Sequence, residues 1–297
     1  MRSYTIHHID AFTQEIFSGN PTVTVLDADT LSVDEMKKIA MEMHLSECGF
    51  ILPSEKADFR LRYFTRSGDE VKFCGHATVG ALCAIATEGR FGCSSPGKNF
   101  YVETNAGVLP MSITQDSRGE YIYSFDAPKI DLSVAPYKLE EVIEALGIDP
   151  ELIDLRQPLM LEKTNNYLYF AAKNLQKLGE IQLDFPSAIR FASQDQIVIF
   201  CIATPEVFDG KNHIHARGFA PLVGVPEDPF TGSMQGGLYA YIQENQWLSP
   251  GVKTVGVEQG HFMGRPGEIQ MEAICHQPLE VRLHAHAFHL FKATLTF

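Results

Sequence analysis

The sequence predicts an α/β fold of two similar lobes that arose by internal duplication. The chain has 297 residues, more than one hydrophobic core usually holds, so two domains are the first expectation. Segments typical of strands surround each predicted helix, in the first half and again in the second. A short motif also occurs twice, at residues 73–80 and 230–237. Together these observations favour two lobes with one architecture.

The composition is typical of a globular protein, with 45% hydrophobic and 21% charged residues. The net charge is −13 and no run of basic residues occurs, which makes nucleic acid and anionic membranes poor partners. The amino terminus has no signal-peptide core, and no apolar stretch approaches the ~18 residues that span a bilayer, so we expect a cytoplasmic protein. The six cysteines show no CxxC pair and are expected to be free thiols.

The first half is predicted to hold a strand pair, a capped helix and then further strands. Gly19-Asn20-Pro21 is a strong turn signal between the first two strands. Ser32 and Glu35 form a capping box, and the apolar residues that follow at helical spacing predict a helix over residues 33–43. Strands are predicted at residues 4–10, 22–25, 48–52, 59–65, 101–104, 108–113 and 121–125.

The second half repeats this alternation of strands and helices. An apolar stripe from Leu139 to Leu146, closed by Gly147, predicts a helix. Strands are predicted at residues 167–171 and 196–202. The same kinds of element therefore recur after the midpoint of the chain.

The repeated motif supports duplication directly. Its copies share a phenylalanine and two glycines and lie 157 residues apart, measured from Gly75 to Gly232. Upstream, Arg62-Tyr63-Phe64 is echoed by Arg217-Gly218-Phe219. Three identities in eight positions also arise by chance where glycine is common, but the matching strand-to-helix pattern favours duplication.

Both copies of the motif turn from a strand into a helix rich in small residues, with Gly75 or Gly232 at the junction. The helices are apolar nearly all round and should be buried. Free N–H groups at a helix start attract carboxylate or phosphate, and glycine lets such a ligand come close. Two such starts facing each other across a cleft between the lobes would form an anion site without lysine. The alternative is that the glycines serve only close helix packing.

Ionisable residues beside these glycines point to proton transfer. His76 follows the first glycine, Asp228 precedes the second, and Ser233 occupies the position equivalent to His76. Glu47 stands immediately before an apolar strand. Each has a simpler alternative: a helix cap for His76, a turn or N-cap for Asp228 and a solvated loop carboxylate for Glu47.

Paired histidines raise the question of a metal. His284 and His286 would share one face of a strand, and His213 and His215 have the same spacing. No carboxylate or cysteine completes either pair nearby in the sequence, so we predict no metal site.

A series of motifs runs in order along the chain. They are Asp10-Ala11-Phe12-Thr13, Gly19-Asn20-Pro21, Ser46-Glu47, Cys74-Gly75-His76-Ala77-Thr78-Val79-Gly80, Glu227-Asp228-Pro229-Phe230-Thr231-Gly232-Ser233, Gln259-Gly260 and Gly264-Arg265-Pro266. This series resembles the phenazine-biosynthesis PhzF-like proteins. The resemblance implies an α+β fold like that of diaminopimelate epimerase, with two similar lobes, each a β-barrel-like sheet around a central helix. The lobes expected are residues 1–125, completed by a C-terminal strand at about 286–297, and residues 126–285.

The resemblance also assigns residues. In the phenazine enzyme of this family, a glutamate matching Glu47 carries a proton during isomerisation of trans-2,3-dihydro-3-hydroxyanthranilate, and the family's histidine, aspartate and serine match His76, Asp228 and Ser233. The predicted catalytic residues are therefore Glu47, His76 and Asp228. The residues predicted to bind substrate are Asn20, Gly75, Ala77, Gly232 and Ser233. The family further implies a homodimer with no metal and no organic cofactor.

The function that follows is an isomerase that shifts a proton at carbon in a small carboxylic acid, with Glu47 as the single base. A second candidate is an amino-acid or hydroxy-acid racemase or epimerase. The related racemases use two cysteines, which correspond to Cys74 and Thr231 here, and a threonine hydroxyl is too weak an acid to replace a thiol. A third candidate, from a different class, is a non-catalytic protein that binds small carboxylates.

Overall fold

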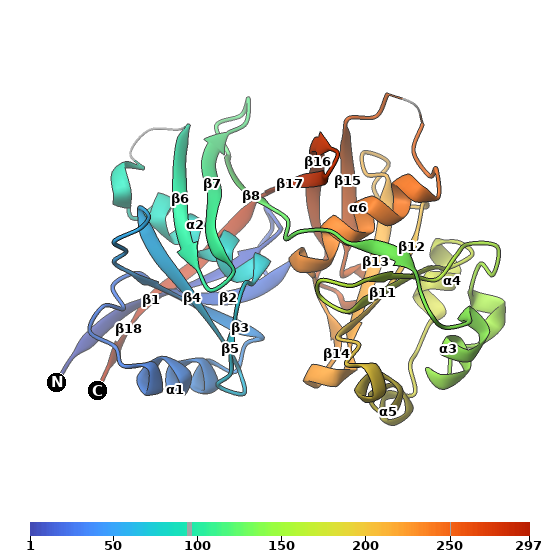
Figure 1. Cartoon of the computed structure of the whole chain (residues 1–297). Coiled ribbons are helices and arrows are strands. Elements are labelled where there is room, and N and C mark those ends of the chain that lie inside the picture. Colours follow the sequence, from blue (N-terminus) through green and yellow to red (C-terminus); the bar gives the residue numbers. More distant parts are fainter. Residues whose placement is uncertain (94–96, 250) are drawn as a thin grey trace. The chain divides into compact units, whose positions relative to one another are not determined.

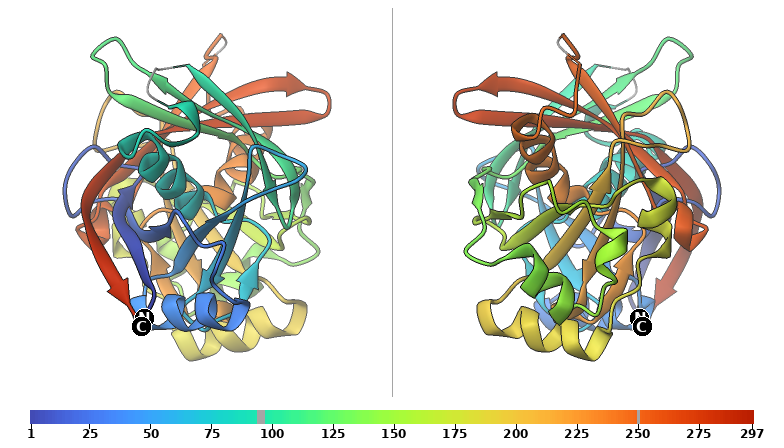
Figure 2. Two further views of the ribbon diagram at one scale, coloured as in Figure 1. Left: turned by 90° about the vertical axis from the view of Figure 1, so that its left-hand side faces the viewer. Right: turned by 90° about the vertical axis from the view of Figure 1, so that its right-hand side faces the viewer.

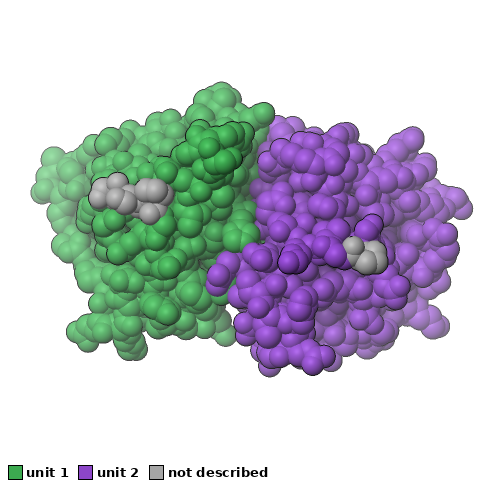
Figure 3. All heavy atoms as spheres, turned by 90° about the horizontal axis from the view of Figure 1, so that it is seen from above, with its two compact units in different colours: residues 1–126, 283–297 green, residues 127–282 purple. Residues whose placement is uncertain are grey.

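The computed structural model describes residues 1–93, 97–249 and 251–297. The chain forms two compact units (Figure 3). Unit 1 contains Met1–Asp126 and Leu283–Phe297, and unit 2 contains Ala127–Arg282. Across the described part of the chain, no helix combines the length and apolar character needed to cross a membrane.

Unit 1 is built from strands around one buried helix (Figure 1). Its strands are β1 (Ser3–Ala11), β2 (Asn20–Val25), β3 (Glu47–Leu52), β4 (Phe59–Thr65), β5 (Glu70–Val71), β6 (Lys98–Thr104), β7 (Gly107–Gln115), β8 (Tyr121–Asp126) and β18 (Ala287–Thr296). Its helices are α1 (Val33–Met43), α2 (Gly75–Thr87) and the short 3-10 helix η1 (Arg90–Gly92).

The sheet of unit 1 has a mixed order. β18 pairs antiparallel with β1, β1 with β2 and β3 with β4, whereas β2 and β3 are parallel. β4 pairs parallel with β6, which continues antiparallel through β7 to β8, and β5 is an antiparallel edge partner of β4. The C-terminal segment also reaches β8, since the Ser124 hydroxyl lies 2.8 Å from His284 Nδ1. Figure 2 shows β18 beside β1, with both termini at one end.

Helix α2 is the core of unit 1. Every residue from Gly75 to Ala86 is buried, as its nearly uniform apolar sequence requires. The helix contacts β1, β2, β3, β8 and β18. A side chain at Gly80 would place its Cβ only 2.3 Å from Thr22 Cγ2 on β2, so glycine allows the helix to lie against this strand.

Unit 2 contains the second set of elements. Its strands are β9 (Leu132–Val134), β10 (Met160–Glu162), β11 (Tyr167–Ala171), β12 (Ile199–Thr204), β13 (Ile214–Ala220), β14 (Val225–Asp228), β15 (Thr254–Gln259), β16 (Gly267–His276) and most of β17 (Leu279–Ala285). Its α-helices are α3 (Leu139–Ala145), α4 (Leu175–Glu180), α5 (Phe185–Asp195) and α6 (Gln235–Glu244). Its 3-10 helices are η2 (Pro150–Leu152), η3 (Pro221–Val223), η4 (Gly232–Met234) and η5 (His261–Met263).

Unit 2 repeats the strand pairing of unit 1 in order and in direction. β9 pairs antiparallel with β10, β10 with β11 and β12 with β13, whereas β11 and β12 are parallel. β13 pairs parallel with β15, β15 antiparallel with β16, and β14 is the antiparallel edge partner of β13. Helix α6 follows the edge strand, as α2 does in unit 1. The duplicated α+β fold is thus confirmed.

A repeated ion pair strengthens the case for duplication. Arg62 on β4 donates two hydrogen bonds of 2.7 Å to the carboxylate of Glu70, and Arg217 on β13 donates bonds of 2.8 and 2.7 Å to Glu227. Both guanidinium groups also lie over the ring of a phenylalanine two residues further on. The recurrence of Arg-x-Phe in the sequence therefore marks equivalent strands with equivalent partners.

Three sequence-based expectations differ from the structure. Helix α5 was not predicted, and its C-cap, Gln196, falls where a strand was expected, so β12 begins at Ile199. The two helix starts are also unequal. Helix α2 begins at Gly75, whereas Gly232 opens the 3-10 turn η4 and the α-helix starts only at Gln235.

Candidate active site

Glu47 is the first residue of β3. Helix α1 ends at Met43, its C-cap His44 has a left-handed conformation with φ of 55°, and the chain then turns into the strand. The Thr22 hydroxyl on the parallel neighbour β2 donates a hydrogen bond of 2.9 Å to the Glu47 carbonyl. The Glu47 side chain is 24% exposed, so its carboxylate can be reached by a ligand although the backbone of Glu47 is held in the sheet.

Cys74 and His76 flank the start of α2. Cys74 is the N-cap and has an extended backbone, and the Thr78 hydroxyl donates a 2.8 Å hydrogen bond to its carbonyl. The Cys74 side chain makes no capping hydrogen bond to the first N–H groups of this helix. Gly75, His76 and Ala77 all lie in this buried first turn.

Strands β2 and β3 and the start of α2 bring four side chains together: Asn20, Glu47, Cys74 and His76. His76 Nε2 lies 3.2 Å from Glu47 Oε2. Cys74 Sγ lies 3.4 Å from His76 Nδ1 and 3.7 Å from Nε2. Asn20 Nδ2 lies 3.4 Å from His76 Nδ1. Asn20 reaches this position because the preceding Gly19 has φ of 58° and approaches the Ala11 carbonyl more closely than a side chain would allow.

The electrostatics of this group follow from burial. Burial lowers the pKa of His76 to about 4, so the imidazole is neutral near pH 7. A neutral imidazole carries one N–H, and the contact between Nε2 and Glu47 assigns the proton to Nε2. Nδ1 then accepts from the amide of Asn20. His76 thus acts as a hydrogen-bond donor to Glu47 Oε2.

Asp228 ends the edge strand β14 in unit 2 and is held by a polar network. The Thr231 hydroxyl donates a 2.7 Å hydrogen bond to Asp228 Oδ2. The buried Gln259 amide donates to the Asp228 carbonyl at 2.8 Å and to the Thr231 hydroxyl at 3.3 Å, and its oxygen accepts from the Thr231 N–H at 3.1 Å. The backbone and side chain of Asp228 are both fixed.

Ser233 lies in the turn η4 that Gly232 opens. Its hydroxyl is 3.0 Å from the hydroxyl of Tyr167 on β11. Gly218 on β13 lets the turn approach the sheet, since a Cβ there would lie 2.7 Å from Thr231 Oγ1. Sequence reasoning had not given Tyr167 or Gln259 a role. Gln259 stood in a recognised motif, whereas Tyr167 carried no local signal.

The repeated pairing shows which positions of the two units correspond. Cys48 pairs with Phe64 in unit 1, and Phe200 pairs with Phe219 in unit 2, so Glu47 is equivalent to Ile199. On the edge strands, Val71 pairs with Tyr63 and Asp228 pairs with Gly218, so Asp228 is equivalent to Val71. Each carboxylate therefore has an apolar counterpart, and each unit supplies a different acid.

His215 shows how a long-range partner escaped the sequence. Glu258 on β15 lies 2.8 Å from His215 Nδ1, a partner 43 positions away that the search for a nearby carboxylate did not reach. Burial opposes ionisation of Glu258, but hydrogen bonds from His215 and from the N–H groups of Phe208 and Asp209 hold its pKa at about 2.

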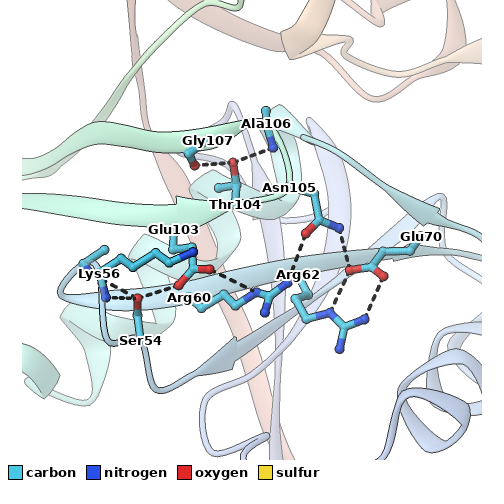
Figure 4. A network of polar contacts seen from close by, with 11 residues as sticks. Ser54, Lys56, Arg60, Arg62, Glu70, Glu103, Thr104, Asn105, Ala106 and Gly107 are labelled. Carbon is cyan, nitrogen blue, oxygen red and sulfur yellow. Dashed lines mark hydrogen bonds and ion pairs between the residues drawn. The ribbon is translucent and has the colours of Figure 1, made fainter.

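The equivalent pair in unit 1, Arg60 and Glu103, has a structural role. The parallel pairing of β4 with β6 sets Arg60 beside Glu103, as the pairing of β13 with β15 sets His215 beside Glu258. Figure 4 shows Glu103 accepting a 2.6 Å hydrogen bond from Ser54, with Arg60 at 4.0 Å. Equivalent carboxylates that bind loop and strand donors in both units indicate that Glu258 stabilises the fold.

Comparison with known proteins places the chain in a family. The family model described as phenazine biosynthesis-like protein matches residues 9–293. An uncharacterized isomerase of Clostridium acetobutylicum is 30% identical over an alignment of 304 positions, which covers 99% of each chain. The crystal structure of a PhzF-family phenazine biosynthesis protein from Bacillus anthracis matches with a TM-score of 0.86 and 28% identity over the whole of both chains.

More distant structures share only the fold. A hydroxyproline epimerase from Agrobacterium vitis matches with a TM-score of 0.62 at 10% identity, over 99% of this chain and 91% of the epimerase. The match of the family model over nearly the whole length, together with the full-length relative at 30% identity, decides the assignment. The chain belongs to the phenazine biosynthesis-like, or PhzC-PhzF, family.

Proposed function

We propose that this protein is a cofactor-independent isomerase that moves a proton from one carbon to another in a small unsaturated carboxylic acid. Glu47 is the general base that removes the proton and the general acid that returns it. The observation that carries the proposal is the 3.2 Å contact between the Glu47 carboxylate and Nε2 of the buried, neutral His76. It orients Glu47 toward the buried imidazole.

His76 is a fixed donor in this scheme. Because burial lowers the pKa of His76 to about 4, the imidazole does not compete with Glu47 for the substrate proton near neutral pH. Its Nε2–H holds the carboxylate in place, and Asn20 fixes the tautomer through Nδ1. Removing either partner would loosen the base without removing it.

Substrate binding is assigned to backbone and polar groups. The first N–H groups of α2, near Gly75 and Ala77, suit a substrate carboxylate because the N-cap side chain of Cys74 makes no hydrogen bond to them. Asp228, whose position Thr231 and Gln259 fix, is proposed to orient a polar group of the substrate. Ser233 and the N–H groups near Gly232 are proposed to bind the substrate as well.

Two features support isomerisation over racemisation. A two-base racemase needs an acid and a base of similar strength on opposite sides of one carbon. The position equivalent to Cys74 holds Thr231, whose hydroxyl is engaged with Asp228, and the position equivalent to Glu47 holds Ile199. The proposed base therefore has no duplicated counterpart.

The test is a proton-shift assay on a panel that begins with trans-2,3-dihydro-3-hydroxyanthranilate and continues through small unsaturated and cyclic carboxylic acids. Products are followed by NMR and optical rotation. We expect the wild-type protein and a Glu42→Gln control, which changes an exposed carboxylate on α1, to form a double-bond isomer. Glu47→Gln should lower the rate by at least about 10³-fold.

Other outcomes identify the rivals. Loss of optical rotation without double-bond movement would favour the racemase. Tight binding of a carboxylate by the wild-type protein, with no proton exchange for any compound of the panel, would favour a non-catalytic binder. Undiminished isomerisation by Glu47→Gln would reject the role of Glu47.

A further inference from the structure

The group around His76 also has the composition of a metal site. Among the residues that the structure describes, Glu47, Cys74 and His76 each offer one ligand atom, and these atoms lie within 4.8 Å of one another. A carboxylate, a thiol and an imidazole are the three side chains that bind zinc most often. They come from β3, the residue before α2 and the first turn of α2.

Two of the three ligand atoms are already placed for one ion. Bond lengths of about 2.3 Å to sulfur, 2.0 Å to nitrogen and 2.0 Å to oxygen at a tetrahedral angle place the sulfur about 3.5 Å and the oxygen about 3.3 Å from the nitrogen. In the structure, His76 Nε2 lies 3.7 Å from Cys74 Sγ and 3.2 Å from Glu47 Oε2. Glu47 Oε2 is therefore already placed to share an ion with Nε2. Cys74 Sγ lies nearer to Nδ1, at 3.4 Å, so the Cys74 side chain must rotate toward the Nε2 side to complete the site.

We infer that Glu47, Cys74 and His76 form a binding site for a thiophilic divalent cation such as Zn²⁺ or Cd²⁺, which inhibits the enzyme. Binding forms three metal–ligand bonds, releases the Cys74 thiol proton to solvent and moves the His76 proton from Nε2 to Nδ1, with no change of oxidation state. The fourth position of a tetrahedral ion is left for water or a substrate carboxylate. This inhibitory role rests on the proposed function, because the ion occupies the lone pairs by which Glu47 takes up a proton.

A second group of potential ligands is a weaker candidate. His215, Glu258 and His261 also place ligand atoms within 4.8 Å of one another. Glu258, however, already accepts hydrogen bonds from His215, from Asn212 and from two backbone N–H groups. A metal ion would have to displace donors that anchor this loop. The group also lacks a thiol, so sulfur coordination separates the two sites experimentally.

The test is titration of the purified full-length protein with Cd²⁺, followed by the ultraviolet thiolate-to-metal charge-transfer band and by calorimetry. We expect one equivalent to produce the band in the wild-type protein. Two controls should behave in the same way: Cys275→Ala, which removes the more exposed thiol, and His261→Asn, which disables the second group. Cys74→Ala should abolish the band, and His76→Asn should weaken binding at least about tenfold.

Cys74→Ser serves where the alanine variant does not fold, since it keeps the shape and removes the soft ligand. A band that persists in Cys74→Ser, or one that disappears in Cys275→Ala, would overturn the inference. Zn²⁺ should also inhibit isomerisation by the wild-type protein reversibly, with recovery on chelation, and should inhibit Cys74→Ser at least about tenfold less.

The two proposals fail separately. Stoichiometric Cd²⁺ binding at Cys74 without any isomerisation would reject the proposed function and leave the site intact. Isomerisation that Zn²⁺ does not affect, with no charge-transfer band, would reject the metal site and leave the proposed function intact.

Discussion

Units 1 and 2 have the same strand order and the same arginine–glutamate pair, yet they hold different reactive groups. Along equivalent strands, Glu47 of unit 1 corresponds to Ile199 of unit 2, and Asp228 of unit 2 corresponds to Val71 of unit 1. The duplication therefore retained the framework that positions the residues. The chemistry diverged at the ends of the strands and helices, where a substitution does not disturb the core.

The largest effect that tests this comparison is expected at the two arginine–glutamate pairs. Arg217 also donates to the carbonyls of Leu178 and Ile181, at 2.7 and 2.8 Å, and its side chain is 8% exposed. Removing one partner of a buried pair costs about 3–5 kcal/mol. Arg217→Met should therefore lower the free energy of unfolding by about that amount, measured by denaturant titration.

The matched variant is Arg62→Met in unit 1. Arg62 is 13% exposed, and Glu70 would still accept a 2.8 Å hydrogen bond from Asn105, as Figure 4 shows. We expect a smaller loss, about 1–3 kcal/mol. Equal losses of unfolding free energy for the two variants would show that the residues around each pair do not change its contribution to stability.

The next effect is the pH dependence contributed by His76. Its pKa is lowered from 6.5 to about 4 by burial, so the unfolded chain binds a proton that the folded chain does not between these values. Above pH 6.5, burial of neutral His76 makes its full contribution to the free energy of unfolding. This contribution, up to about 3 kcal/mol, is lost as the pH falls toward 4. The free energy of unfolding of His76→Asn should fall less steeply over this window. An unchanged slope would show that His76 is not buried as a neutral group.

Asp228 should affect catalysis less than the base does. Asp228→Asn keeps the shape and still accepts from the Thr231 hydroxyl, but it removes the charge proposed to orient the substrate. We expect kcat/KM to fall by about 10²-fold, with the isomer product unchanged. Thr231→Val, which loses the hydroxyl, should reproduce part of this loss. Full activity of Asp228→Asn would remove unit 2 from the proposed chemistry.

The smallest effect is expected at Cys74. It contacts His76 but has no assigned part in the proton shift, so Cys74→Ala should change kcat by less than about threefold. A loss of two or more orders of magnitude would instead make the thiol a catalytic acid. That outcome would revive the racemase candidate.

The sequence predicted local features of the fold well. The helix expected over residues 33–43 is confirmed as α1, because the capping box of Ser32 and Glu35 and the apolar spacing are both local signals. The strand expected at residues 167–171 is confirmed as β11. Helix α5 was missed, although Asp184 caps it and Pro186 stands in its first turn. Both are local signals from which the helix could have been predicted.

Long-range partners could not be predicted in the same way. The pairing of β13 with β15 brings Glu258 to His215 across 43 positions of sequence, and no spacing rule indicates it. The equivalence of Glu47 with Ile199 likewise depends on strand register, which the repeated motif did not contain. Neighbouring residues fix helices and turns, whereas the register of distant strands decides which side chains meet. The roles assigned to Glu47, His76 and Asp228 stay predictions.

The central claim is that one base, Glu47, carries the proton. The most direct measurement is deuterium exchange from D₂O into bound substrate, compared between Glu47→Gln and Asp228→Asn at saturating substrate. We predict that exchange is abolished in Glu47→Gln and persists at a reduced rate in Asp228→Asn. Exchange that continues in Glu47→Gln, or that stops only in Asp228→Asn, would contradict the account.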